Sequence, residues 1–232
     1  MMDIIRSEDR GAADHGWLKA KHTFSFADYH NPERMGFRSL RVINEDRIEP
    51  GHGFGTHPHR DMEIVTYIIE GALEHKDSMG NGSVIRAGDV QRMTAGTGVF
   101  HSEFNHSQED QVHLLQIWIL PGRPSLQPGY EQLNFGRDDK LNKWRLIGSS
   151  DGRDGSVTIH QDVELYATIL ESDHEVEHAF AAGRRGFLQI VSGSAVVEGE
   201  TLDAGDAMAL DGVETLTMSS QKDTEALLFD LA

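Results

Sequence analysis

The sequence contains no cysteine, few basic residues and no long apolar run. Without cysteine, disulfides, thiolate catalysis, zinc-finger sites and iron–sulfur clusters are excluded, so any bound metal must have nitrogen and oxygen ligands. Lysine and arginine number 21 against 38 aspartates and glutamates, which gives a formal net charge of −17. Because an acidic surface repels phosphate backbones, we expect no direct contact with nucleic acid.

Segments typical of export or membrane insertion are also missing. The first residues, "MMDIIRSEDRG", lack the apolar core of a signal peptide. No run approaches the ~18 apolar residues that a membrane span needs. We therefore expect a cytoplasmic protein without a membrane partner, long enough at 232 residues to form one or two globular domains.

Helical periodicity is scarce, whereas short β-rich runs recur along the chain. The runs "SLRVINEDRI", "MEIVTYIIEG" and "VHLLQIWILP" are rich in β-branched and aromatic residues, and many of the 24 glycines separate such runs. Strands at short, regular spacing are typical of a β-sandwich or β-barrel, so we predict an all-β fold.

The chain also repeats its own pattern. Residues 67–93 read "YIIEGALEHKDSMGNGSVIRAGDVQRM" and residues 188–210 read "LQIVSGSAVVEGETLDAGDAMAL". Both pass through a strand, a glycine, a second strand and a turn to "AGD" and a further strand. This self-similarity predicts two similar β-barrels in tandem.

The join between the two barrels is expected in residues 120–135. This segment, "LPGRPSLQPGYEQLNF", holds three of the six prolines of the chain. We expect residues 1–130 to form an N-terminal metal-binding barrel and residues 131–232 to form a C-terminal barrel that lacks metal ligands.

Two pairs of polar residues carry the chemistry. In a strand, residues two apart point to the same face, so His57 and His59 of "GTHPHRD" share one face, as do His101 and Glu103 of "VFHSEFN". His101 follows His59 by 42 positions, which leaves room for the intervening strands to bring the pairs together. One His-x-His pair among 13 histidines would mean little by itself, but a second pair and the repeat strengthen the interpretation.

Three imidazoles and one carboxylate suit a divalent first-row metal such as iron, copper, nickel, manganese or cobalt. Spacing does not decide which carboxylate completes the set, because Glu63 has the same parity as His57 and His59. Glu63 is therefore an alternative to Glu103, or a residue of the barrel wall that supports a ligand.

The segment from Gly51 to Asn105, which contains both pairs, resembles the pirins, a branch of the cupin superfamily. "HGWLKAKHTFSFADY" and "GFRSLRVINED" upstream and "RDGSVTIHQDVELY" downstream match the same group, so the resemblance covers nearly the whole chain. Two departures from the general cupin pattern are present: Thr94 replaces the usual proline, and four residues separate Gly96 from His101. The second departure is itself typical of pirins.

The resemblance implies a bicupin, two jelly-roll-type barrels with one metal in the first. It assigns the ligands to His57, His59, His101 and Glu103, and so favours Glu103 over Glu63. Iron(II) is the preferred metal, with copper, nickel, manganese or cobalt as alternatives. The resemblance to bacterial pirin-like proteins implies a quercetin 2,3-dioxygenase, in which dioxygen and a flavonol react with cleavage of the heterocyclic ring. For this reaction we expect Glu103 to have two roles, as a metal ligand and as the acceptor of the proton of the substrate hydroxyl.

A second function is consistent with the same four residues. Other pirins are regulatory proteins that act through protein partners, with the metal as a switch, and in that case activity on quercetin would be incidental. Fold and ligands alone do not decide between the two functions.

The repeat offers a check on the number of metals. Aligning Gly71 with Gly193 places Ala179 and Ala181 opposite the first histidine pair, with His178 on the outer face. Aligning the "AGD" segments places Met218 and Ser220 opposite the second pair. We therefore expect one metal per chain.

Other candidates have simpler interpretations. His75, Gln91 and Met93 lie on the same predicted strands as the site, and we interpret them as residues of the barrel wall. His160 and Glu164 are spaced as metal ligands on a helix would be, but they fall in a predicted strand, so we expect a structural role.

Overall fold

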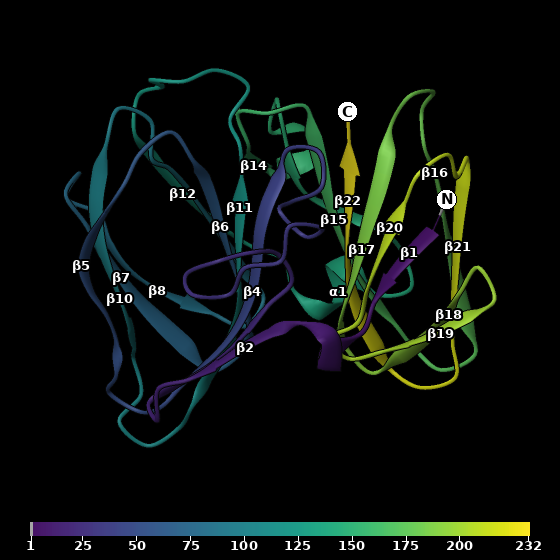
Figure 1. Ribbon diagram of the computed structural model, residues 1–232, viewed down its shortest axis with the longest axis horizontal. Coiled ribbons are helices and arrows are strands. Elements are labelled where there is room, and N and C mark those ends of the chain that lie inside the picture. Colours follow the sequence, from purple (N-terminus) through teal and green to yellow (C-terminus); the bar gives the residue numbers. More distant parts are fainter. Residues whose placement is uncertain (1) are drawn as a thin grey trace. The chain divides into compact units, whose positions relative to one another are not determined.

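The computed structural model describes residues 2–232, and these residues form almost entirely antiparallel strands (Figure 1). In this range, helical structure is limited to three short segments: η1 (Ser7–Asp9), α1 (Arg137–Lys140) and η2 (Arg153–Gly155). The prediction of an all-β chain with two cupin-type halves is confirmed. None of the helices within residues 2–232 has the length and apolarity required to cross a membrane.

The contacts group the chain into two compact units. The N-terminal unit comprises residues 11–134 and 157–161, and the C-terminal unit comprises residues 2–10, 135–156 and 162–232. Residues 2–10 thus belong to the C-terminal unit, although residues 11–134 of the other unit follow them directly. Residues 157–161 belong to the N-terminal unit, although segments of the C-terminal unit flank them on both sides. The functional division into residues 1–130 and 131–232 stays a prediction.

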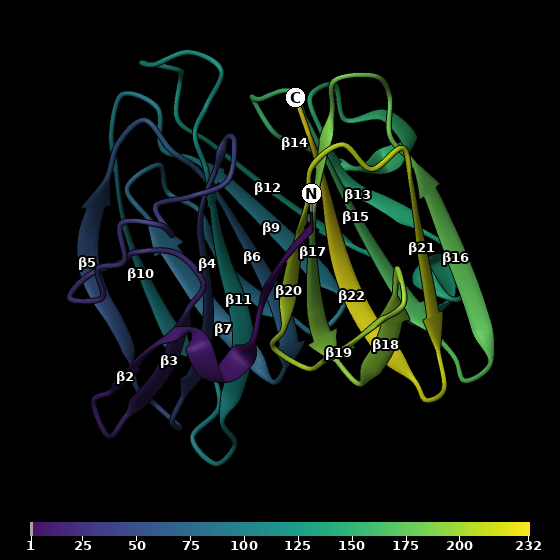
Figure 2. The same cartoon turned by 45° about the vertical axis from the view of Figure 1, so that its right-hand side comes forward.

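The N-terminal unit is a pair of antiparallel sheets. One has the strand order β5–β10–β7–β8, and the other has the order β12–β9–β6–β11–β4–β3–β2. In both views, β5 and β10 lie on one side of this unit and β4, β6 and β11 on the other (Figures 1 and 2). The strands of this unit are β2 (Gly11–Asp14), β3 (Leu18–His22), β4 (Leu40–Ile48), β5 (Gly53–His59), β6 (Glu63–Glu70), β7 (Ala72–Asp77), β8 (Gly82–Arg86), β9 (Asp89–Thr94), β10 (Val99–Asn105), β11 (Val112–Ile119), β12 (Gly129–Asn134) and β14 (Val157–Thr158).

The C-terminal unit repeats this arrangement. Its larger sheet contains the order β1–β20–β17–β22–β15–β13, and its smaller sheet has the order β16–β21–β18–β19. The strands are β1 (Met2–Ile5), β13 (Arg145–Ser149), β15 (Val163–Leu170), β16 (His174–Ala179), β17 (Arg185–Ser192), β18 (Ser194–Val197), β19 (Glu200–Asp203), β20 (Ala207–Leu210), β21 (Thr215–Ser220) and β22 (Thr224–Leu231).

Burial patterns explain how each strand is oriented. Strand β10 alternates: Val99, His101, Glu103 and Asn105 are buried, whereas Phe100 and the residues of its parity point outward. Strand β6 is buried at every position from Glu63 to Ile68, because it lies in the middle of the larger sheet. The alternating strand therefore brings two ionisable side chains into the interior, where burial changes their chemistry.

The repeat alignment was wrong in one respect. In the strand ladders, His101 pairs with His57 and Val99 with His59, while Met218 pairs with Val176 and Leu216 with His178. The positions that correspond to the first pair are thus Val176 and His178, and Ala179 is exposed. The connection to the next strand is longer in the C-terminal unit, residues 180–184 against 60–62, and this difference shifts the register.

The parity argument predicted that His178 lies on the outer face. The structure places it on the inner face instead. Its Nε2 lies 2.8 Å from Oδ2 of Asp230, and its ring packs against Tyr166 and Phe180. The neighbouring inward positions on β16 and β21 are occupied by Val176, Met218 and Ser220.

Candidate metal centre

Strand β5 places two histidines at the edge of the smaller sheet of the N-terminal unit. His57 and His59 flank Pro58, and a proline is tolerated here because an edge strand can leave one backbone position unpaired. The register between β5 and β10 shifts between His101 and Glu103, which marks a β-bulge. Bulges are common beside functional sites because they change the direction of a side chain.

Strand β10 supplies the second pair from the adjacent position in the sheet. His101 lies directly opposite His57 in the ladder, and both His101 and Glu103 are buried, at 1% and 3% relative exposure. The predicted meeting of the two segments therefore follows from the pairing of β5 with β10.

The three imidazoles converge. Nε2 of His57 and Nε2 of His101 lie 3.0 Å apart, and the ring centroid of His59 is 4.8 Å from each of the other two. Two nitrogens that bind one ion at right angles, each at about 2.1 Å, are separated by about 3.0 Å. The spacing of these nitrogens therefore fits a shared divalent cation.

The tautomer of His57 supports the same conclusion. Its Nδ1 lies 2.8 Å from the carbonyl oxygen of Gly55 and can only donate to it, so the proton belongs on Nδ1. Nε2 of His57 then presents a lone pair toward Nε2 of His101. Two lone pairs at 3.0 Å repel each other unless a proton or a metal ion lies between them.

Burial favours the neutral form of His59 and His101, which is the form that binds a metal. Burial lowers the pKa of His59 to about 4, with a smaller contribution from the charge of His57. Burial also lowers the pKa of His101 to about 2, aided by the charges of His57, His59 and His75.

Glu103 occupies a different electrostatic environment from an exposed carboxylate. Burial raises its pKa to about 7, although a hydrogen bond from Gln116 acts in the opposite direction. Nε2 of Gln116 donates to both carboxylate oxygens, at 3.0 and 3.1 Å, and its Oε1 accepts from the Thr66 hydroxyl at 3.1 Å. Oε2 of Glu103 is 3.8 Å from Nε2 of His101.

Two overlapping groups in residues 2–232 could hold an ion. His57, His59 and His101 form one, and His75, His101 and Glu103 form the other; in each, the potential ligand atoms lie within 4.8 Å of one another. His101 belongs to both groups, so it links Glu103, the fourth residue of the set assigned by resemblance, to His57 and His59. His75, interpreted from the sequence as a residue of the barrel wall, belongs to the second group.

Glu63, the alternative carboxylate, lies elsewhere in the N-terminal unit. It is fully buried, and its Oε2 accepts hydrogen bonds from the Thr94 hydroxyl at 3.1 Å and from the backbone N–H of His160 at 3.2 Å. His160 Nδ1 is also 3.2 Å from this oxygen. Among the residues described, Glu63 belongs to neither of the two groups that could hold an ion.

The sequence interpretation missed Gln116. The signal was present, because Gln116 is the polar residue inside the apolar run "LLQIWIL". A half-buried polar side chain within an apolar strand needs a partner, and in this case the partner is Glu103.

A pocket of about 310 Å³ opens beside the three histidines. Its surface is mostly apolar, with Trp118 stacked edge-on against His59 at 5.0 Å between ring centroids and against Phe26 at 5.4 Å. Pockets of this size and character suit one small, largely apolar ligand. The pocket is lined by Leu18, Ala20, His22, Phe26, Asn44, Asp46, Phe54, His57, His59, Glu103, Gln116 and Trp118.

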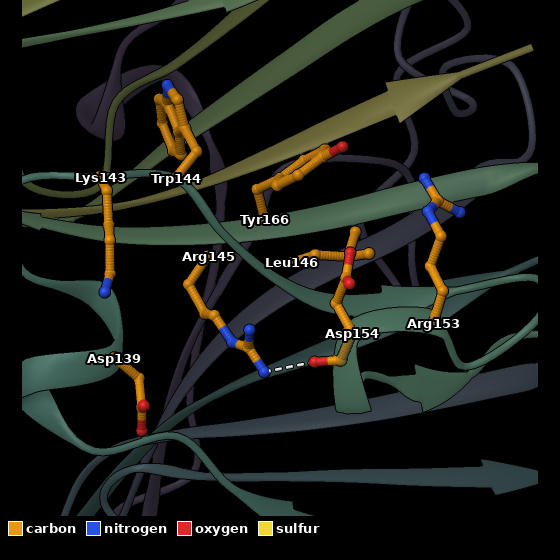
Figure 3. A pocket seen from close by; sticks show the side chains of 8 residues that line it. All are labelled: Asp139, Lys143, Trp144, Arg145, Leu146, Arg153, Asp154 and Tyr166. Carbon is orange, nitrogen blue, oxygen red and sulfur yellow. Dashed lines mark hydrogen bonds between the residues drawn. The ribbon is translucent and has the colours of Figure 1, made fainter.

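The C-terminal unit has a pocket of another kind (Figure 3). It measures about 480 Å³, contains no histidine, and carries charges of both signs. Arg145 donates a hydrogen bond to the backbone carbonyl oxygen of Asp154, as the dashed line shows. This donor set does not match that of the N-terminal unit. The lining residues are Asp139, Lys143, Trp144, Arg145, Leu146, Arg153, Asp154 and Tyr166.

Comparison with known families gives two matches. Residues 5–119 match the pirin family, and residues 146–231 match the quercetinase C-terminal cupin domain. The chain is 47% identical over 231 residues to quercetin 2,3-dioxygenase of Escherichia coli K12, covering 100% of this chain and 99% of that protein. It is also 38% identical to the pirin-like protein of Caulobacter vibrioides, with full coverage of both chains.

The chain belongs to the pirin family. Among solved structures, this pirin matches bacterial pirin YhhW from Escherichia coli in complex with nickel(II), with a TM-score of 0.95 and 46% identity over 100% of this chain and 99% of that one. The resemblance to pirins and to the cupin fold is therefore confirmed over the full length of the chain.

Proposed function

We propose that this pirin is a metal-dependent dioxygenase that cleaves the heterocyclic ring of flavonols such as quercetin. The observation that carries the proposal is the convergence of three imidazoles near a buried carboxylate and an apolar pocket. The name of the Escherichia coli relative, quercetin 2,3-dioxygenase, supports the choice of substrate class.

The proposed ligands are His57, His59, His101 and Glu103, with one divalent metal per chain. Iron(II) is the first candidate, and nickel(II), which the Escherichia coli pirin binds, is the second. A divalent metal bound there would supply Lewis acidity, which lowers the pKa of a hydroxyl that approaches it.

The residues of the chain would supply binding, water exclusion and proton transfer. The flat rings of a flavonol would lie against Trp118 and Phe26, and these apolar walls would keep water away from the reacting atoms. Glu103 would accept the proton of the flavonol 3-hydroxyl on a carboxylate oxygen. Gln116 would hold that carboxylate in position.

The test is turnover by protein loaded anaerobically with each metal and then mixed with quercetin and dioxygen. Loss of the flavonol absorbance should require metal. Each of His57→Ala, His101→Ala and Glu103→Gln should reduce the rate by at least about 100-fold. His106→Ala, at an exposed histidine that pairs with Glu74 outside the site, is the matched control and should leave the rate unchanged.

Equal rates with and without metal would refute this mechanism. Tight metal binding with negligible turnover on every flavonol tried would instead favour the regulatory alternative, in which the pirin acts through a protein partner.

A further inference from the structure

Two residues of the neighbouring strand β7, His75 and Asp77, lie next to His101 and have buried side chains. Strand β7 pairs with β10 on the side opposite to β5, so that Asp77 faces His101 and His75 faces Glu103 across the ladder. The side chains of His75 and Asp77 are both fully buried. Neither belongs to the proposed ligand set.

The three side chains form a chain of polar contacts. Nδ1 of His101 lies 3.5 Å from Nδ1 of His75, which is at the long limit of a hydrogen bond, and Nε2 of His75 lies 3.1 Å from Oδ2 of Asp77. The ring of Tyr130 packs on His75, with 5.0 Å between centroids. The order of atoms thus runs from the carboxylate through one imidazole to the next.

Asp77 is fixed as the acceptor at the end of this chain. Its Oδ1 accepts the backbone N–H groups of Met79 and Asn81 at 2.9 and 3.0 Å, and its Oδ2 accepts the side-chain amide of Asn81 at 2.9 Å. Because both of its oxygens accept hydrogen bonds from these donors, Asp77 acts as the acceptor toward His75.

This acceptor determines the position of each proton along the chain. His75 must carry its proton on Nε2 to donate to Asp77, which leaves a lone pair on Nδ1. His101 can then donate from Nδ1 to that lone pair, which leaves Nε2 of His101 free to face His57. This is the tautomer that a metal at the three histidines requires.

We propose that His75 and Asp77 are positioning residues that hold His101 in its Nδ1-protonated tautomer and so present Nε2 to the metal. The proposal rests on the proposed metal site and concerns the state in which an ion occupies it.

A competing explanation is that His75 is itself a ligand, since His75, His101 and Glu103 also lie close together. In that arrangement the ion would use Nδ1 of His101, because that atom faces His75. It would then lose Nε2 of His101 and with it the contact to His57. The two explanations therefore predict different results for the same substitutions.

The experiment uses Asp77→Asn and His75→Phe in the full chain. In protein loaded with zinc(II), which is diamagnetic, nitrogen-15 NMR of the histidine rings should report His101 protonated at Nδ1 in the wild type. In Asp77→Asn, the new amide can donate to His75 and reverse the chain, which favours a proton on Nε2 of His101 and so competes with the metal for that atom. Nickel(II) affinity, measured by calorimetry, should fall about 10–100-fold in both variants, and the ligand-field absorption of bound cobalt(II) should shift.

The matched controls are Glu45→Gln and His113→Phe. They alter another buried histidine that contacts a carboxylate in the same unit, at 2.9 Å, and that is absent from both candidate metal groups. Both controls should retain wild-type nickel affinity and the wild-type tautomer of His101, even if they unfold more easily.

Three results would overturn the proposal. One is an Nε2-protonated His101 in the wild type, and another is an unchanged tautomer and affinity in Asp77→Asn. The third is complete loss of nickel binding in His75→Phe, equal to that of His57→Ala, which would make His75 a direct ligand. A wild type that binds no metal would refute the proposed function, whereas tight metal binding that is unchanged in Asp77→Asn would refute the tautomer proposal alone.

Discussion

The glycines of strand β5 allow a sharp test of how closely the two ligand-bearing strands must approach. Gly53 is the first residue of β5 and pairs with Phe104 of β10. A Cβ atom at this position would lie 2.2 Å from the carbonyl oxygen of Glu103 and 2.5 Å from Cα of Phe104. Both neighbours are backbone atoms, so neither can rotate away.

Gly53→Ala should therefore force β5 and β10 apart by about 1 Å at this point, since real Cβ contacts are longer than 3.0 Å. Overpacking of this kind costs about 1–3 kcal/mol of unfolding free energy. Because the same ladder sets the spacing between His57 and His101, we expect nickel(II) affinity to fall by about tenfold or more. The first effect is measured by urea denaturation of the metal-free protein and the second by calorimetry.

Gly55→Ala is the matched control, two residues along the same strand. A Cβ at Gly55 would meet no atom within 4 Å, and its φ is not in the left-handed region. The unfolding free energy of Gly55→Ala should equal that of the wild type or exceed it by up to about 1 kcal/mol, because alanine reduces the conformational entropy of the unfolded chain. Wild-type stability and nickel affinity in Gly53→Ala would refute the argument that this contact sets the site.

Two further predictions follow from the interior of the N-terminal unit. Gln116→Met should lower nickel(II) affinity about 10- to 100-fold, because it removes the hydrogen bonds to both oxygens of buried Glu103, each worth about 1.5–3 kcal/mol to a charged group. Gln91→Met, at a buried glutamine whose Oε1 has no partner, is the control and should leave affinity unchanged in the same calorimetric titration. The double variant His57→Val, His101→Met should lose metal binding. Its unfolding free energy, measured by urea denaturation, should rise by about 1–3 kcal/mol. A lower unfolding free energy than that of the wild type would contradict this prediction.

Sequence spacing identifies which residues share a face of one strand. It does not identify which strands are neighbours in a sheet. His57 and His59 share a face because residues two apart in a strand must do so. Glu63 satisfies the same parity, yet β6 lies in the larger sheet while β5 and β10 are neighbours in the smaller one. Strand pairing is a tertiary property, and only the resemblance to pirins distinguished Glu103 from Glu63.

Polar residues that support the site were harder to recognise than those proposed to bind the metal. His75 was interpreted as a residue of the barrel wall, and its contacts with His101 and Asp77 depend on the pairing of β7 with β10. The register of the C-terminal unit was missed for a related reason: a longer connection moved His178 onto the inner face, which the glycine alignment could not show.

The ladder correspondence between the units explains why the double variant should be stabilising. At the positions that correspond to His57 and His101, the C-terminal unit has Val176 and Met218, and both are buried in one apolar cluster. In the N-terminal unit, buried imidazoles of lowered pKa and a carboxyl of raised pKa occupy the same part of the fold. Burying polar groups without full compensation costs free energy, whereas burying aliphatic groups contributes it. Both units thus have the same arrangement of sheets with different interiors. The polar interior of the N-terminal unit lowers its stability but provides groups that can hold a cation.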